Sequence, residues 1–203
     1  MTALTTRAAL AATAVLLAAT ACSSGTDLAD VDYYLDLSDD PMPASDMELS
    51  TLEGDPWRFT DVADDRLTLL FFGYTSCPDV CPMTMAEIAL ALENAEADAE
   101  DFDVVMVTSD PARDTGEQLR SWLDRFDPDF QGVRGDIDVT VEAAMDYGVP
   151  IEAPQETDGE YLVSHGGRII VLTPDGEAAG LFEEGVEADD IAELLPVLSG
   201  ELL

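Results

Sequence analysis

The chain has 203 residues, enough for one ordinary domain, and 47% of them are apolar, enough to build a core. It carries 44 Asp and Glu against 8 basic residues, all of them Arg, so its formal net charge is −36. This charge excludes nucleic acid as a partner, because phosphate binding needs a basic face. The apolar content excludes a disordered acidic tail.

The acidic residues run through the whole chain from Asp27 onward. Like charges spread over a folded surface destabilise it in dilute buffer, and molar salt, with a Debye length of about 3 Å, screens them. The Lys-free acidic composition is therefore similar to that of proteins from salt-loving organisms. An acidic interaction face is the alternative. The same charge favours a monomer outside high salt.

The first 21 residues have the pattern of a secretory signal peptide. One basic residue, Arg7, precedes an uncharged stretch over residues 8–21, which is shorter than the roughly 20 apolar residues of a membrane-spanning helix. The sequence Ala-Thr-Ala-Cys that ends at Cys22 resembles a lipobox, which predicts lipidation of Cys22. Ordinary cleavage that leaves an incidental cysteine is the alternative. We expect a lipid-anchored protein on the extracytoplasmic face of the cell membrane.

A tether is expected over residues 22–45, and an extension packed on the domain is the alternative. The folded domain is expected over 46–203. Alternating and continuous apolar runs predict strands, and helical spacing predicts helices. The expected elements are a hairpin within 47–62, a strand at 67–72, a helix at 83–97, a strand at 104–107, a helix at 114–126 capped by Asp114, a helix at 138–147, strands at 161–163, 168–172 and 178–182, and a helix at 188–198. This order predicts an α/β, thioredoxin-like fold, with a central mixed sheet flanked by helices and an N-terminal β-hairpin.

Two cysteines, Cys77 and Cys81, lie between a predicted buried strand and the start of a helix. Unpaired N–H groups at a helix start favour thiolate over thiol. Two thiolates form a soft bidentate metal site, and an oxidant converts them to a disulfide. A structural disulfide, or a pair of buried core cysteines, is the alternative without a metal or redox function. A disulfide that closes so short a loop adds little stability.

His165 is the only histidine of the chain. It precedes Gly166 and Gly167 at a predicted strand end, where the backbone can be approached closely, and in a thioredoxin-like layout this connection can come near the cysteines. Two Cys and one His make three ligands, fewer than the four of most structural zinc sites. Soft thiolates select Cu(I), and imidazole suits Cu(II). Copper is therefore the metal that fits best, and zinc completed by a carboxylate or water is the alternative.

The chain resembles the Sco/SenC copper proteins from about Asp46 to Leu198. The resemblance rests on residues 73–82 (GYTSCPDVCP), 109–115 (SDPARDT) and 163–165 (VSH). It implies a membrane-tethered copper metallochaperone that helps to assemble the copper A centre of cytochrome c oxidase subunit II. By position, Cys77, Cys81 and His165 would bind Cu(I) and Cu(II). Ser164 stands where the family often has an acid that could orient the imidazole.

Two other functions use the same cysteines. A thiol–disulfide reductase that acts on the cysteines of oxidase subunit II would use Cys77 and Cys81 as its redox-active pair. Whether the protein is an enzyme therefore stays open. A thiol peroxidase is the third class, but the sequence has no clear peroxidatic Thr-x-x-Cys motif at Cys77. The lone histidine favours the copper carrier, because dithiol exchange does not require it.

Overall fold

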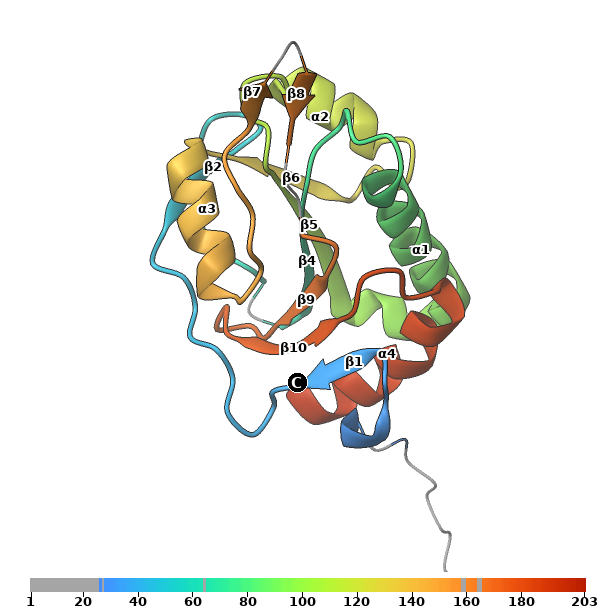
Figure 1. The fold of residues 1–203 in the computed structure, drawn as a ribbon. Coiled ribbons are helices and arrows are strands. Elements are labelled where there is room, and N and C mark those ends of the chain that lie inside the picture. Colours follow the sequence, from blue (N-terminus) through green and yellow to red (C-terminus); the bar gives the residue numbers. More distant parts are fainter. Residues whose placement is uncertain (1–25, 27, 64, 158–159, 164–165) are drawn as a thin grey trace, which may run out of the picture.

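The computed structural model describes residues 26, 28–63, 65–157, 160–163 and 166–203. Helices cover both faces of a twisted mixed sheet (Figure 1). The strands are β1 (Tyr34–Asp36), β2 (Glu48–Thr51), β3 (Pro56–Arg58), β4 (Leu67–Gly73), β5 (Phe102–Thr108), β6 (Gln131–Arg134), β7 (Gln155–Thr157), β8 (Glu160–Leu162), β9 (Ile169–Leu172) and β10 (Ala178–Phe182). The helices are α1 (Val80–Ala95), α2 (Gly116–Leu123), α3 (Ile137–Asp146) and α4 (Ala188–Leu202), with short 3₁₀ segments η1 (Leu28–Asp30) and η2 (Glu96–Asp101).

Eight strands form the main sheet in the order β1-β10-β9-β4-β5-β6-β2-β3. β4, β5 and β6 run parallel to one another. β9 is antiparallel to β4, and β10 is antiparallel to β9. Every residue of β4 is buried, as its continuous apolar sequence predicts for a strand covered on both faces. This is the expected thioredoxin-like α/β fold.

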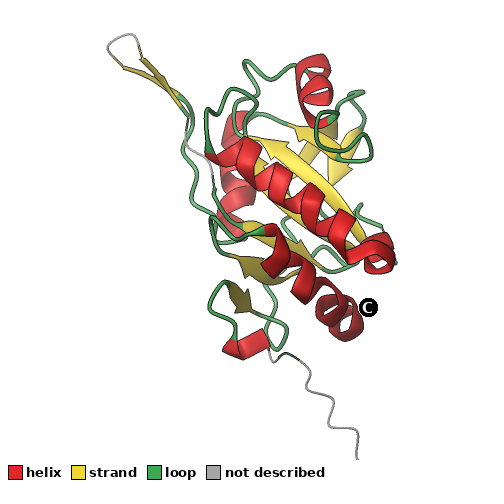
Figure 2. Cartoon of the chain, turned by 90° about the vertical axis from the view of Figure 1, so that its right-hand side faces the viewer, coloured by secondary structure: helices red, strands yellow, loops and turns green. Residues whose placement is uncertain are grey.

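The side chains of β4 alternate between two cores. Leu69 and Phe71 pack in the core that contains the buried faces of α1, α2 and α4, the side seen in Figure 2. Leu70 and Phe72 pack on the opposite face, in the core that contains α3. Because β4 is fixed from both sides, the loop that leaves its C-terminal end starts from a rigid base.

The expected hairpin is present as β2 and β3, which pair antiparallel around Gly54 at φ 93°. The expected tether over 22–45 needs correction at its C-terminal part. β1 pairs with β10 at the edge of the main sheet, and Leu28 and Tyr34 are buried in the core. The alternative, an extension packed on the domain, therefore holds from Leu28 onward. A strand of three residues gives too little pattern to be found without its partner.

Other elements also differ from the prediction. α1 begins at Val80 rather than Met83, because Pro82 sits in the first helical turn, where its missing N–H has no partner to lose. α2 is capped by Thr115 rather than Asp114 and ends at Leu123. β6 and β7 were not expected. β8 lies at the expected strand 161–163, but it pairs with β7 outside the main sheet, and Figure 2 shows this hairpin extending away from the rest of the domain. No helix in the described part of the chain is both long and apolar enough to span a bilayer.

Candidate metal site

The two cysteines of the predicted site lie where β4 gives way to α1. β4 ends at Gly73, at the carboxyl edge of the sheet. Cys77 follows in a turn, and the N–H of Cys77 donates to the carbonyl of Tyr74 at 3.2 Å. Cys81 is the second residue of α1. Ligand sites of open α/β sheets lie at this edge.

The structure brings the two cysteines into direct contact. The backbone N–H of Cys81 donates to Sγ of Cys77 at 3.3 Å. Both residues are free cysteines, with Cys77 7% exposed and Cys81 fully buried. An otherwise unpaired N–H of the first helical turn thus faces the sulfur that would carry negative charge as a metal ligand. The disulfide between them stays a prediction for oxidising conditions.

Gly73 makes room for the second sulfur. A Cβ atom at this position would lie 3.0 Å from Sγ of Cys81 and 2.5 Å from Cε1 of Phe71. Both neighbours are fully buried, so neither can move into solvent. The close approach of the Phe71 ring and of the Cys81 sulfur therefore requires glycine at the end of β4.

The surroundings of Cys81 favour its protonated form. Burial raises the pKa of the Cys81 thiol well above its ordinary value, and the nearby Cys77 and Asp114 add to the rise, while a backbone hydrogen bond from Tyr74 opposes it. Burial also raises the pKa of Tyr74 to about 12, with a contribution from Cys77. A cation bound to the sulfurs would compensate the charge that this environment disfavours.

A buried carboxylate that the sequence assigned to a helix cap holds the cysteine loop instead. Asp114 is fully buried and accepts hydrogen bonds from the Thr75 N–H at 3.0 Å, from the Thr75 hydroxyl at 2.5 Å and from the Thr108 hydroxyl at 2.5 Å. In the same loop, Arg113 forms an ion pair with Asp110. The Arg113 guanidinium also lies 6.0 Å from the centre of the Tyr74 ring. Sequence spacing could not show that Asp114 and Thr75 meet, because they lie 39 positions apart, at opposite ends of the β4–α1–β5 crossover.

The predicted third ligand, His165, lies outside the described residues, as do Ser164 and Cys22. The chain that follows His165 enters β9 at Ile169, which pairs with Phe71 near the end of β4. This segment therefore joins the sheet at the end from which the cysteine loop departs. Among the described residues, no three His, Cys, Asp or Glu side chains cluster closely enough to hold a metal ion. The participation of His165 stays a prediction.

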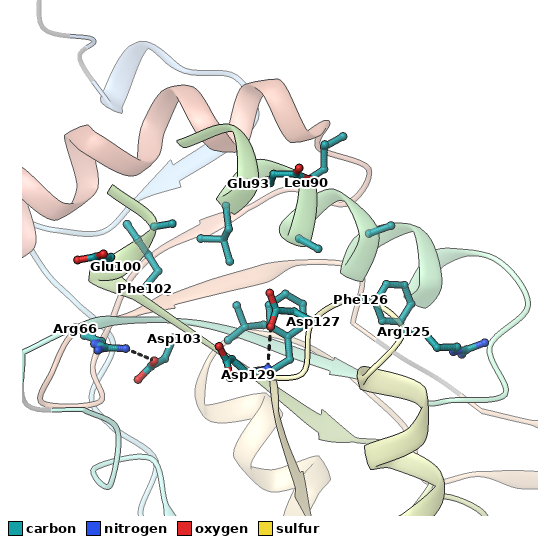
Figure 3. A pocket seen from close by; sticks show the side chains of 16 residues that line it. Arg66, Leu90, Glu93, Glu100, Phe102, Asp103, Arg125, Phe126, Asp127 and Asp129 are labelled. Atoms are coloured by element: carbon teal, nitrogen blue, oxygen red, sulfur yellow. Dashed lines mark hydrogen bonds and ion pairs between the residues drawn. The ribbon is translucent and has the colours of Figure 1, made fainter. Parts of the chain in front are cut away.

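A broad groove of about 840 Å³ lies elsewhere, between α1, η2 and the loop before β6 (Figure 3). Leu90 and Glu93 of α1 border it on one side, and Asp127 and Asp129 border it on the other. Neither cysteine lines it. The groove is separate from the candidate metal site.

Comparison with known proteins identifies the family. The SCO1/SenC family model matches residues 44–198. The chain belongs to the SCO1/SenC family. The match covers the hairpin, the cysteine loop and α4 to Leu198, so this SCO1/SenC protein contains the family domain over nearly all of its described part. The resemblance inferred from the sequence motifs is confirmed.

Relatives of this SCO1/SenC protein include a Stutzerimonas stutzeri protein whose name describes it as copper-binding, 34% identical over 138 residues, 68% of each chain. The mitochondrial SCO1 homologue of Homo sapiens is 28% identical, and the match covers 70% of this chain and 51% of the human protein. Several mitochondrial relatives are matched over only about half of their own length or less.

Solved structures agree with this assignment. Bradyrhizobium japonicum ScoI with copper bound is 29% identical with a TM-score of 0.65, and the match covers 76% of this chain and 98% of that one. Apo Sco1 of Thermus thermophilus is 33% identical with a TM-score of 0.64, covering 78% and 92%. Similar folds at this identity thus occur both with and without copper.

Proposed function

We propose that this protein is a copper carrier in the assembly of cytochrome c oxidase, with Cys77 and Cys81 as thiolate ligands. One observation carries the proposal: in a SCO1/SenC domain, two free cysteines are in contact at the carboxyl edge of the central sheet. Soft thiolates select Cu(I). Copper-binding relatives support the choice of metal.

In this proposal copper is the cargo of the protein. Cu(I) binds as both thiols lose their protons to solvent, and imidazole of His165 joins them for Cu(II). Cys77 is the more accessible residue of the pair, at 7% exposure against 0% for Cys81. Transfer therefore begins by exchange of Cys77 for a thiolate of the recipient, while Cys81 keeps hold of the metal.

The recipient in this proposal is the copper A site of cytochrome c oxidase subunit II. The protein is held at the extracytoplasmic face of the membrane by a lipid on Cys22, after removal of the signal peptide over 1–21. The lipobox-like sequence before Cys22 supports the anchor. The acidic, Lys-free composition supports a salt-rich working environment.

The alternative is a thiol–disulfide reductase that keeps the subunit II cysteines reduced. The contact between the two sulfur-bearing residues favours it as well, because Cys77 could attack a disulfide and Cys81 could resolve the mixed disulfide, leaving Cys77–Cys81 oxidised and the substrate reduced. This function needs no histidine.

The His165→Ala variant separates the two functions. Copper-loaded protein is mixed with copper-free subunit II domain, and appearance of the copper A absorption is followed. In parallel, the reduced, copper-free protein is mixed with the oxidised subunit II domain, and the free thiols that appear on the subunit II domain are counted. Loss of copper transfer with retained disulfide reduction supports the carrier. Unchanged copper transfer by the variant overturns the three-ligand proposal.

A further inference from the structure

The carboxylate of Asp114 links three parts of the molecule that meet at the cysteine loop. It follows β5 in the sequence, it accepts a hydrogen bond from Thr108 at the end of β5, and it accepts two from Thr75, two residues before Cys77. Its side chain is fully buried. A buried carboxylate needs such donors, because its burial without them is costly.

The rest of the connection explains why the cysteine loop depends on this residue. The N–H of Ser109 donates to the carbonyl of Gly73 at 2.7 Å, which joins the ends of β4 and β5. Between Gly73, where β4 ends, and Val80, where α1 begins, the loop belongs to neither the sheet nor a helix. Thr75 lies in this interval, and both of its donors, the N–H and the hydroxyl, are bound by Asp114. Asp114 therefore replaces the sheet as the support of the loop.

We propose that Asp114 is a positioning residue of the SCO1/SenC copper site, which holds the loop before Cys77 so that both sulfurs stay together and Cys81 stays buried. Without the carboxylate, Thr75 loses the acceptor for its N–H and its hydroxyl. The loop then opens between Gly73 and α1. Two thiols on a more mobile loop lose more conformational entropy when they bind a metal, which weakens the binding. This inference rests on the proposed copper function, but its first test needs no copper.

Three variants make the test. Asp114→Ala removes the acceptor for all three hydrogen bonds. Asp114→Asn keeps the shape, because its amide oxygen can accept from the Thr75 N–H and from Thr108, while its amide N–H can donate to a turned Thr75 hydroxyl. Thr115→Ala is the matched control: it removes the cap of α2 on the next residue, with a loss of stability, and it leaves both hydrogen bonds between Asp114 and Thr75 in place.

The first readout is the rate at which iodoacetamide alkylates Cys81 in the reduced, copper-free protein, well below the melting temperature. Asp114→Ala should raise this rate at least about tenfold, Asp114→Asn by about threefold or less, and Thr115→Ala by less than about twofold. The second readout is Cu(I) affinity against a chromophoric chelator, which should fall at least about tenfold in Asp114→Ala alone.

Equal alkylation rates in Asp114→Ala and the wild type, or an equal rise in Thr115→Ala, overturn the inference. If Asp114→Ala does not fold, Thr75→Val takes its place, since it removes one donor of the loop and keeps the side-chain shape; a rate like that of the wild type again overturns the inference. A wild-type protein that binds no copper refutes the proposed function instead, and the alkylation result still decides the role of Asp114.

Discussion

Replacing Gly73 by Ala tests how tightly the sheet and the metal site are coupled. The added Cβ would lie 2.5 Å from Cε1 of Phe71 and 3.0 Å from Sγ of Cys81. Carbon atoms in good contact are about 3.5–4.0 Å apart, so the Phe71 ring must retreat by about 1 Å. The ring is fully buried, so it cannot move out into solvent.

The magnitude follows from two opposing effects. Overpacking of a buried site costs about 1–3 kcal/mol, and replacing glycine restricts the unfolded chain, which returns about 0.4–1 kcal/mol. We expect a net loss of about 1–2 kcal/mol, which lowers the melting temperature by about 2–4 °C for each kcal/mol. Displacement of the Cys81 sulfur should lower Cu(I) affinity by about threefold to tenfold.

Gly132→Ala is the matched control for this change. Gly132 also lies in a central part of the sheet, and a Cβ there would lie 3.0 Å from Cδ1 of Leu52 and 3.1 Å from Leu119. This variant should lose stability and keep the Cu(I) affinity of the wild type. Chemical denaturation and chelator competition on the same samples give both quantities. An unchanged affinity in Gly73→Ala, with a stability loss like that of Gly132→Ala, would refute the coupling.

The remaining predictions concern stability. Burial raises the pKa of Cys81, Tyr34 and Tyr147 in the folded protein, so above about pH 9 the unfolded chain loses these protons first and stability should fall with rising pH. Urea titrations between about pH 8 and pH 11 check this, and a flat profile contradicts it. Tyr147→Phe leaves the Ser45 N–H and the Gly176 carbonyl without their shared partner, which should cost about 1–3 kcal/mol in denaturant unfolding; a loss below about 0.5 kcal/mol would show that these groups find other partners. Raising NaCl from about 0.1 M to about 2 M should raise the melting temperature, because it screens a net charge of −36. A melting temperature that falls with salt would refute charge repulsion as the cause.

The sequence predicts the parts of the fold that carry strong local patterns. β4 is recognisable because a strand buried on both faces is apolar at every position, and α3 because helical spacing ends at Gly148, whose φ is 67°. β1 escapes prediction, because it is a strand of three residues that exists through its pairing with β10. Local pattern carries no information on such a partner.

The candidate site divides in the same way. The sequence predicts that Cys77 and Cys81 lie between a buried strand and the start of a helix, and the structure places them at the junction of β4 and α1, in contact with each other. The prediction that Asp114 caps α2 was wrong. Its short distance in sequence from α2 suggests a cap, but its hydrogen-bond partners, Thr75 and Thr108, come from other elements. Thr115, the next residue, provides the cap instead. The sequence shows which side chains can accept or donate hydrogen bonds, and the tertiary fold decides which partners they meet.

Copper binding by the reduced protein in molar salt tests the central claim most directly. Metal analysis gives the stoichiometry, and the visible spectrum after Cu(II) addition reports a thiolate-to-copper charge-transfer band, with Cys77→Ala and His165→Ala measured beside the wild type. The account predicts one copper per chain and a band that is lost in Cys77→Ala and altered in His165→Ala. A protein that retains no copper, and instead forms a Cys77–Cys81 disulfide that exchanges readily with thiols, would contradict it.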